Sequence, residues 1–298
     1  MNPVNSKKEQ LFLIGMLASM FCWGLSWASA KVLGSYGTAL SISLIRYGTS
    51  FLSLLIILLL FRKDLRIQRS GLKDLFIASI ILAFYFFAFF KGLEEGLAGA
   101  GGVLVTILNP IISYLLMLLL NWRKPNKNEA LGLAIGLIAG VILLKIWEQT
   151  NSLLSTGNIY FLLASVSWAV LSVFTSKFSQ HGSPVVYSFW MYGICSLITL
   201  LFTTSSENIS VFEKADIYFW GNLFFSATIT TAMATTFYFV ATSKLGASKA
   251  SSFIFLVPFT AAMGSWIFLG EVPQWHTIVG GILGIVAVYI LNKKNSKQ

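Results

Sequence analysis

The fold class is decided by the stretch FLVPFTAAMGSWIFLGEVPQWHTIVGGILGIVAVYIL, residues 255–291. It contains the end of one long apolar run, a short polar turn at 270–274, and the whole of a second apolar run. A bilayer span needs about 20 mostly apolar residues, because every backbone polar group in hydrocarbon must be satisfied within its own helix. The stretch therefore predicts two consecutive transmembrane helices.

The same pattern extends over the whole chain. Of its 298 residues, 56% are hydrophobic and only 11% are charged, which is far from the balance of a soluble domain. Spans are predicted at 11–33, 39–61, 75–92, 97–120, 130–147, 158–177, 185–204, 217–240, 246–269 and 275–292. We therefore predict an all-α integral membrane protein with ten transmembrane helices.

Membrane topology explains the net charge of +10 better than nucleic-acid binding does. The basic residues are scattered singly through short loops instead of being gathered on one face. With a cytoplasmic amino terminus, most of the 21 lysines and arginines fall in inside segments, as the positive-inside rule requires. We predict that both termini are cytoplasmic, that lipid surrounds the chain and that nucleic acid is not a partner.

Residues that usually carry catalysis or hold metals are sparse. Cys22 and Cys195 both fall in the middle of predicted spans, and His181 and His276 lie in separate loops or span edges. This spacing predicts neither a disulfide framework nor a metal site. The sequence contains no phosphate-binding glycine loop and no HExxH motif, so we expect no cofactor and no enzymatic activity.

An internal repeat divides the chain. Its matching pairs are Trp23 and Trp168, Tyr47 and Tyr192, Pro110 and Pro258, and Gly136 and Gly284. The predicted division is a first repeat at 1–147, a linker at 148–157, a second repeat at 158–292 and a cytoplasmic tail at 293–298. Five helices is an odd number, so the second half must enter the membrane from the opposite side. Such inverted repeats place a binding site near the bilayer midplane at their interface, which favours transport.

Three motifs resemble the EamA-type drug/metabolite transporter superfamily: FCWGLSWASAK at 21–31, LIRYG at 44–48, and the stretch 255–291. The resemblance covers nearly the whole chain. It implies alternating access in a bacterial inner (plasma) membrane, for substrates that range from amino acids to drugs and nucleotide-linked metabolites. The first half reads NWRKP at 121–125 where the second reads LGEVP at 269–273, so Glu271 has no symmetric carboxylate.

Aromatic residues in mid-span are candidates for the substrate cavity. Trp23 and Trp168 occupy equivalent mid-helix positions, and Trp27 lies one turn from Trp23 on the same face. Their rings either stack on a planar or cationic substrate or simply fill the helix interface. Tyr85 and Tyr238 are further candidates, each of which either places a hydroxyl in a cavity or packs in the core.

Polar candidates are fewer, and no Asp or Glu lies deep in a predicted span. Arg46 lies about two turns inside its helix and binds either a substrate anion or backbone carbonyls of a neighbouring helix. Lys249, near the inner end of its span, is expected to act as a cytoplasmic gate or an anchor. Thr231 belongs to a threonine-rich helix side that either lines the pathway or bonds to its own turns, and Asn109 precedes a proline in mid-helix.

Proline and glycine positions suggest hinges and close packing. Pro110 and Pro258 each remove a backbone donor, so their helices should kink. Each kink serves as a hinge, lines a cavity or only improves packing. The helices at 130–147 and 275–292 carry glycines at four-residue spacing, which lets helices approach closely. The glycine face either packs within a monomeric chain or forms a homodimer through these two helices.

These observations predict a transporter that moves a small organic solute outward by alternating access. The expected solute is an amino acid or a related metabolite. One alternative is a carrier for nucleotide-linked or lipid-linked anionic metabolites, which should depend strongly on Arg46 or Lys249. The other is a non-transporting membrane sensor or assembly subunit.

Overall fold

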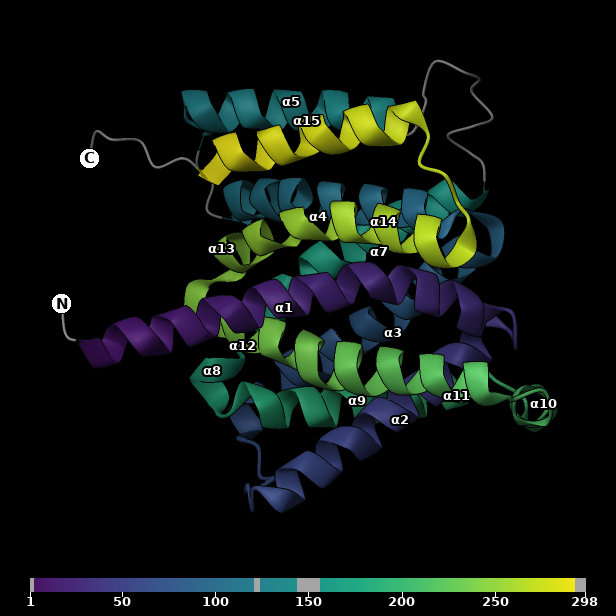
Figure 1. The fold of residues 1–298 in the computed structure, drawn as a ribbon. Coiled ribbons are helices and arrows are strands. Elements are labelled where there is room, and N and C mark those ends of the chain that lie inside the picture. Colours follow the sequence, from purple (N-terminus) through teal and green to yellow (C-terminus); the bar gives the residue numbers. More distant parts are fainter. Residues whose placement is uncertain (1–2, 121–123, 144–155, 293–298) are drawn as a thin grey trace.

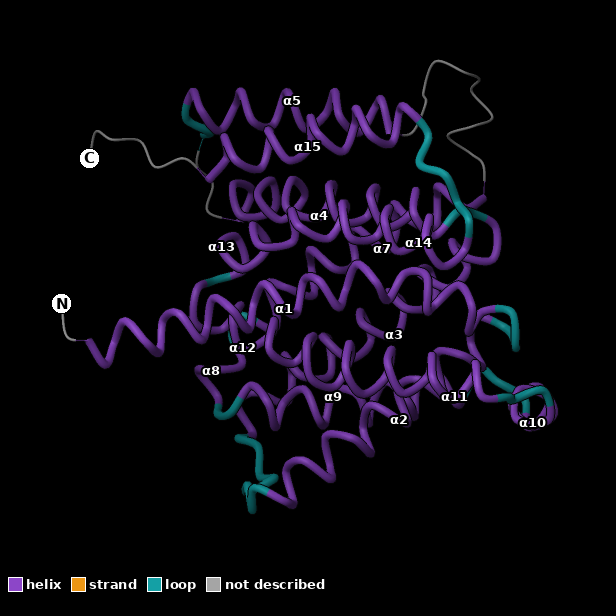
Figure 2. Tube along the Cα trace, viewed as in Figure 1, coloured by secondary structure: helices purple, strands orange, loops and turns teal. Residues whose placement is uncertain are grey.

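The computed structural model describes residues 3–120, 124–143 and 156–292, and over these ranges the chain forms helices and loops without a strand (Figure 1, Figure 2). The first part contains α1 (Pro3–Gly34), α2 (Ala39–Leu60), η1 (Arg69–Gly71), α3 (Leu72–Glu95), α4 (Ala98–Leu120) and α5 (Lys127–Leu143). The second part contains α7 (Thr156–Thr175), α8 (Phe178–His181), α9 (Pro184–Leu200), α10 (Ser205–Glu213), α11 (Ile217–Leu223), η2 (Phe224–Thr235), α12 (Thr236–Leu245), α13 (Ala247–Ser251), η3 (Ser252–Leu256), α14 (Val257–Leu269) and α15 (Trp275–Asn292).

Six helical segments within the described residues are long and apolar enough to cross a membrane. They are Gln10–Gly34, Ala39–Leu60, Arg69–Glu95, Ala98–Leu120, Gly157–His181 and Ile217–Leu245. A seventh arises if α9 and α10, which meet at 109°, count as one, and α14 and α15 are apolar but shorter. The all-helical membrane class is thus confirmed, whereas the count of ten spans stays a prediction.

The helix predicted at 217–240 departs from regular α geometry. It is continuous through α11, η2 and α12, but η2 is a π-helix of 12 residues. Within it, the Thr231 hydroxyl donates to the Ser226 carbonyl at 2.8 Å and the Thr235 hydroxyl to the Thr230 carbonyl at 2.9 Å, both five residues back. Segments of π-helix are rare and occur frequently at functional sites.

The helix predicted at 185–204 ends early, because α9 stops at Leu200. The chain then turns into α10, which begins with a capping box: the Thr204 hydroxyl accepts from the Glu207 N–H, and the Glu207 carboxylate accepts from the Thr204 N–H. This reciprocal pair satisfies backbone groups that the first turn of a helix leaves open. The capping box therefore starts a new helix at Ser205, next to the point where the predicted span was expected to end.

Helix contacts occur in matched pairs. α1 packs on α14 as α7 packs on α4, and α2 packs on η2 as α9 packs on α3. α2 also packs on α9, α4 on α14, and α5 on α15. Figure 1 shows α5 and α15 side by side at one edge of the bundle, with the start of α1 and the end of α15 at the same end of the molecule.

Two aromatic residues that the predicted repeat makes equivalent meet in the core. The Tyr47 and Tyr192 rings stack with centroids 6.3 Å apart, and both side chains are fully buried. The Tyr47 hydroxyl donates to the Leu82 carbonyl at 2.8 Å, and the Tyr192 hydroxyl donates to the Thr231 carbonyl at 2.9 Å. Large apolar side chains such as Leu137 instead cover the outside, as expected for a lipid-facing surface.

Candidate functional site

A small cavity lies in the middle of the bundle, between the two parts of the chain. Its volume is about 50 Å³. It is lined by residues of α1, α2, α3, α4, α7, η2, η3 and α14. Six of the predicted candidates line it: Trp23, Trp27, Arg46, Tyr85, Asn109 and Trp168.

Aromatic rings form one wall of the cavity. Trp23 meets Trp168 edge to face at a centroid distance of 5.0 Å, and Tyr85 lies 4.7 Å from Trp168. Trp27 packs 4.6 Å from Phe89. These rings hold one another in place through contacts that aromatic pairs favour. The result is an apolar wall with several ring faces and edges close to the cavity.

Arg46 brings a positive charge to this wall from α2. Its side chain is only 3% exposed, and its Nε donates to the Thr231 hydroxyl at 3.1 Å. The guanidinium carbon lies 4.8 Å from the centroid of the Phe86 ring, in cation–π contact. Among the described contacts, Arg46 thus bonds to a hydroxyl of a neighbouring helix, and its binding of a substrate anion or of backbone carbonyls stays a prediction. Its Nη1 has no hydrogen-bond partner within the described part of the chain.

The π-helix η2 positions the threonines that face this site. Thr235 accepts a hydrogen bond from Trp23 Nε1 at 3.0 Å, while its own hydroxyl donates back to the Thr230 carbonyl. Thr231 accepts from Arg46 and donates back in the same way. Each hydroxyl thus donates to a carbonyl of its own helix and also accepts a hydrogen bond from a side chain of α1 or α2.

The remaining candidates lie beside the cavity or outside the described side chains. Thr231 lies behind Arg46, and Tyr238 packs 4.9 Å from Trp23. The Lys249 backbone belongs to α13, but its side chain lies outside what the structure describes. Pro258 lines an apolar groove between α14 and α15 instead of the cavity, which its neighbour Val257 lines.

The two prolines sit in different helix geometries. Pro110 is inside α4, next to the cavity residue Asn109. Pro258 lies in the first turn of α14, directly after the 3-10 segment η3, where the missing N–H of proline costs least. Short 3-10 segments within a helix often mark hinges. A hinge role stays a prediction for both residues.

Some residues of the site were not singled out from the sequence. Phe86 and Phe89 lie in an aromatic run that surrounds α3, so sequence alone does not tell which rings point inward. Thr106 also lines the cavity, and its hydroxyl donates to the Gly102 carbonyl. Its position one turn before Pro110 was the only available signal.

Glu271 caps a helix. Its carboxylate accepts from the Gly99 N–H at 3.0 Å and from the Ala98 N–H at 3.3 Å, at the start of α4. The first N–H groups of a helix have no partner within it, and a negative charge there is favoured by the helix dipole. A capping role needs no second carboxylate. It is therefore compatible with the lack of an acidic residue at the equivalent position of the first half. The equivalent residues 121–123 lie outside the described ranges.

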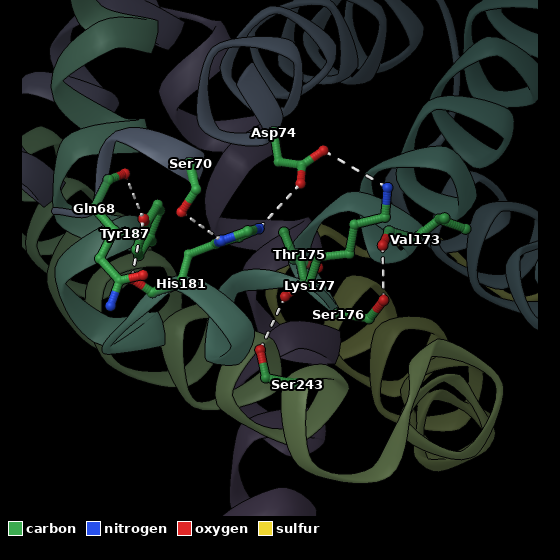
Figure 3. Close-up of polar contacts among 10 residues, drawn as sticks. All are labelled: Gln68, Ser70, Asp74, Val173, Thr175, Ser176, Lys177, His181, Tyr187 and Ser243. Atoms are coloured by element: carbon green, nitrogen blue, oxygen red, sulfur yellow. Dashed lines mark hydrogen bonds and ion pairs between the residues drawn. The ribbon is translucent and has the colours of Figure 1, made fainter. Parts of the chain in front are cut away.

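At the opposite end of the bundle, a polar cluster joins the two parts of the chain (Figure 3). Asp74 at the start of α3 lies 3.6 Å from Lys177 Nζ and 3.6 Å from His181 Nε2. Ser70 Oγ lies 3.1 Å from His181 Nδ1, and the Tyr187 hydroxyl donates to the His181 carbonyl at 3.3 Å. The sequence marks Lys177 only as one of the basic residues of a short loop, without indicating a partner.

The comparisons with known proteins agree on one family. The model of the EamA-like transporter family matches the chain twice, at residues 10–145 and 155–293. The chain belongs to the EamA-like transporter family. Its similarity to the uncharacterized transporter YoaV of Bacillus subtilis is 25% identity over 281 residues, covering 93% of this chain and 95% of YoaV. The uncharacterized transporter YyaM of the same species is 26% identical over 292 residues, covering 92% and 93%.

Two further proteins are similar over part of their length or in fold. The WAT1-related protein At3g02690, chloroplastic, of Arabidopsis thaliana is 26% identical over 216 residues, covering 68% of this chain and 50% of that protein. A solved structure titled "Crystal structure of protein" has a TM-score of 0.59 at 16% identity, covering 92% of this chain and 95% of the other. This structural likeness concerns the fold alone.

Proposed function

We propose that this EamA-family protein carries a small organic solute across a bacterial inner (plasma) membrane by alternating access. The cavity between the two parts of the chain carries this proposal. Trp23 and Trp168, which are equivalent in the repeat, both line it, as expected for a site at the interface of two repeats. Buried polar atoms of Arg46 and Asn109 remain unpaired there among the described residues, so a bound solute has groups to satisfy.

The proposed scaffold is a 5+5 inverted repeat with ten spans, divided as predicted around the linker at 148–157. The matched helix contacts support it, because a two-fold relation between halves generates each contact twice. Contacts between equivalent residues, Trp23 with Trp168 and Tyr47 with Tyr192, support it further, since equivalents meet only near a two-fold axis.

Cavity size and end contacts support alternating access. A volume of about 50 Å³ is well below the roughly 300–1,000 Å³ of typical ligand sites, so loading needs the halves to separate. Contacts between the halves exist at both ends: Tyr36 donates to Asp216 at one, and Asp74 faces Lys177 at the other. We propose that each set opens in turn, with the Asp74 end and both termini cytoplasmic.

The proposed solute is an amino acid or a related metabolite, moved outward. A lining with Arg46 as its one described cation supports a solute with a single negative charge over a nucleotide-linked or lipid-linked phosphate. We also propose that the monomer is the working unit. A Cβ on Gly136 would meet Ile111, and one on Gly284 would meet Ile107, both within 2.5 Å and both on α4, so these glycines serve packing within the chain.

Counterflow in proteoliposomes tests the proposal. Vesicles containing the purified protein are loaded with unlabelled amino acids and diluted into labelled phenylalanine. We expect transient accumulation of label that protein-free vesicles lack. Screens with nucleotides, sugar phosphates and cationic drugs define the alternatives. Absence of counterflow for every class would contradict transport, and binding without flux would favour a sensor.

A further inference from the structure

Four side chains on the cavity hold buried polar atoms without a hydrogen-bond partner among the described residues. These atoms are Arg46 Nη1, Asn109 Nδ2, Thr230 Oγ1 and Trp168 Nε1. The side chains are between 2% and 5% exposed. Leaving a buried donor unpaired is costly, so several unpaired donors on residues that line one cavity point to a ligand with acceptors. Trp168 Nε1 counts least, because the Tyr238 hydroxyl is close enough to interact with it.

The charge of the cavity points the same way. Arg46 is the one charged side chain among the described residues that line the cavity, and no aspartate or glutamate belongs to that lining. A guanidinium stays protonated in proteins, so the positive charge persists. Its neighbours, the Thr231 hydroxyl and the Phe86 ring, are uncharged groups. The cavity therefore presents an uncompensated positive charge to whatever enters it.

We infer that the solute is an organic monocarboxylate with a planar apolar body. Its carboxylate binds Arg46 Nη1 and the Asn109 amide, and its body lies against the Trp23 and Trp168 rings. This inference rests on the proposed function and names the substrate class of the same site. A single guanidinium matches one negative charge, whereas a phosphate dianion brings a second charge that the lining does not offset.

The inference also ranks amino acids against their relatives. An ammonium group meets no carboxylate in the described lining, and Arg46 repels it. Removing the amino group from a substrate therefore preserves binding, whereas removing the carboxylate abolishes it. Phenylalanine provides a matched set, since 3-phenylpropionate lacks only its amino group and phenethylamine lacks only its carboxylate.

The experiment measures binding of these three probes to the detergent-purified full chain, by calorimetry and by shift of the melting temperature. Variants are Arg46→Gln, Arg46→Lys and the control Arg66→Gln, whose side chain is 92% exposed in a loop. We expect 3-phenylpropionate to bind at least as tightly as phenylalanine and phenethylamine to give no shift. Arg46→Gln should weaken 3-phenylpropionate at least tenfold, Arg46→Lys should weaken it less, and Arg66→Gln should match the wild type.

Tighter binding of phenethylamine than of 3-phenylpropionate would overturn the inference. So would unchanged affinity in the folded Arg46 variants, or failure of the wild type to bind 3-phenylpropionate at millimolar concentration. If Arg46→Gln does not fold, Arg46→Lys and Asn109→Ala give the same test. Counterflow that is unchanged in the Arg46 variants would support transport and contradict the anion site. Binding that depends on Arg46, without any flux, would support the anion site and contradict transport.

Discussion

The Trp23 indole ring lies edge-on against the Trp168 ring, with centroids 5.0 Å apart and planes at 88°. The two residues are equivalent in the predicted repeat, yet their indole N–H groups differ in hydrogen bonding. Trp23 Nε1 donates to Thr235, whereas Trp168 Nε1 makes no hydrogen bond of normal geometry with a described residue. The Trp23 indole is therefore fixed by a direct hydrogen bond, whereas the Trp168 indole is held by its ring contacts with Trp23 and Tyr85.

This asymmetry predicts different outcomes for matched substitutions. Trp23→Phe should destabilise the protein by about 1 kcal/mol, because it removes a hydrogen bond from a buried site. Trp168→Phe should cost less stability, since its N–H has no such partner, and both should weaken solute binding. Melting temperature and counterflow measure the two effects. Trp266→Phe, at a ring that is 55% exposed, is the control. Unchanged counterflow in both cavity variants would exclude a role in the site.

The π-helix predicts a cross-helix effect. Thr235→Val should cost about 1–3 kcal/mol, because it leaves Trp23 Nε1 buried without an acceptor and removes the bond to the Thr230 carbonyl. Thr199→Val is the matched control, because the Thr199 hydroxyl donates only to the Cys195 carbonyl of its own helix among the described contacts. Thermal unfolding in detergent compares them. Equal losses in the two variants would show that the link between α1 and η2 adds nothing.

The capping role of Glu271 is tested by shortening and by neutralising the side chain. Glu271→Ala should destabilise the protein by about 1 kcal/mol, because two first-turn N–H groups of α4 lose their acceptor. Glu271→Gln keeps an acceptor and should cost less, through the lost interaction with the helix dipole. Unfolding of both is compared with Glu213→Ala at the exposed end of α10. A larger loss for Gln than for Ala would contradict capping.

Hydropathy predicted the helical segments, and six residues that the sequence singled out line the cavity. A charge inside a span is rare, which singled out Arg46, and mid-span tryptophans in equivalent places singled out Trp23 and Trp168. These signals depend on position along a helix, which the sequence carries directly. They place residues at the interface of the halves without saying how the side chains bond.

The features that the sequence did not predict depend on packing between segments that are distant in the chain. The amino-acid composition of Phe224–Thr235 does not distinguish a π-helix from an α-helix, since threonines also occur in ordinary helices. Likewise, the sequence does not indicate that Asp74 faces Lys177 or that Glu271 reaches the start of α4. Each of these contacts joins residues about 100 or more positions apart, so only the folded arrangement determines them.

The contact between Tyr36 and Asp216 predicts a pH effect at the end of the bundle opposite Asp74. The Tyr36 hydroxyl donates to Asp216 Oδ1 at 2.6 Å, and this bond, with help from the Phe219 N–H, lowers the pKa of Asp216 below its usual value. A carboxyl whose pKa is lower in the folded state stabilises the protein above its unfolded pKa. That contribution is lost as the pH falls through the folded pKa.

Tyr36→Phe should therefore lower the melting temperature at pH 7 and make it less sensitive to acid, since the pKa of Asp216 moves back toward about 3.9. The wild-type and variant curves should begin to approach each other as the pH falls below about 5, and they should meet only below the lowered folded pKa of Asp216. Tyr218→Phe, at an exposed ring on α11, should follow the wild type throughout. A difference between wild type and Tyr36→Phe that stays constant down to pH 3 would mean that the hydroxyl acts through packing and not through the ionised Asp216.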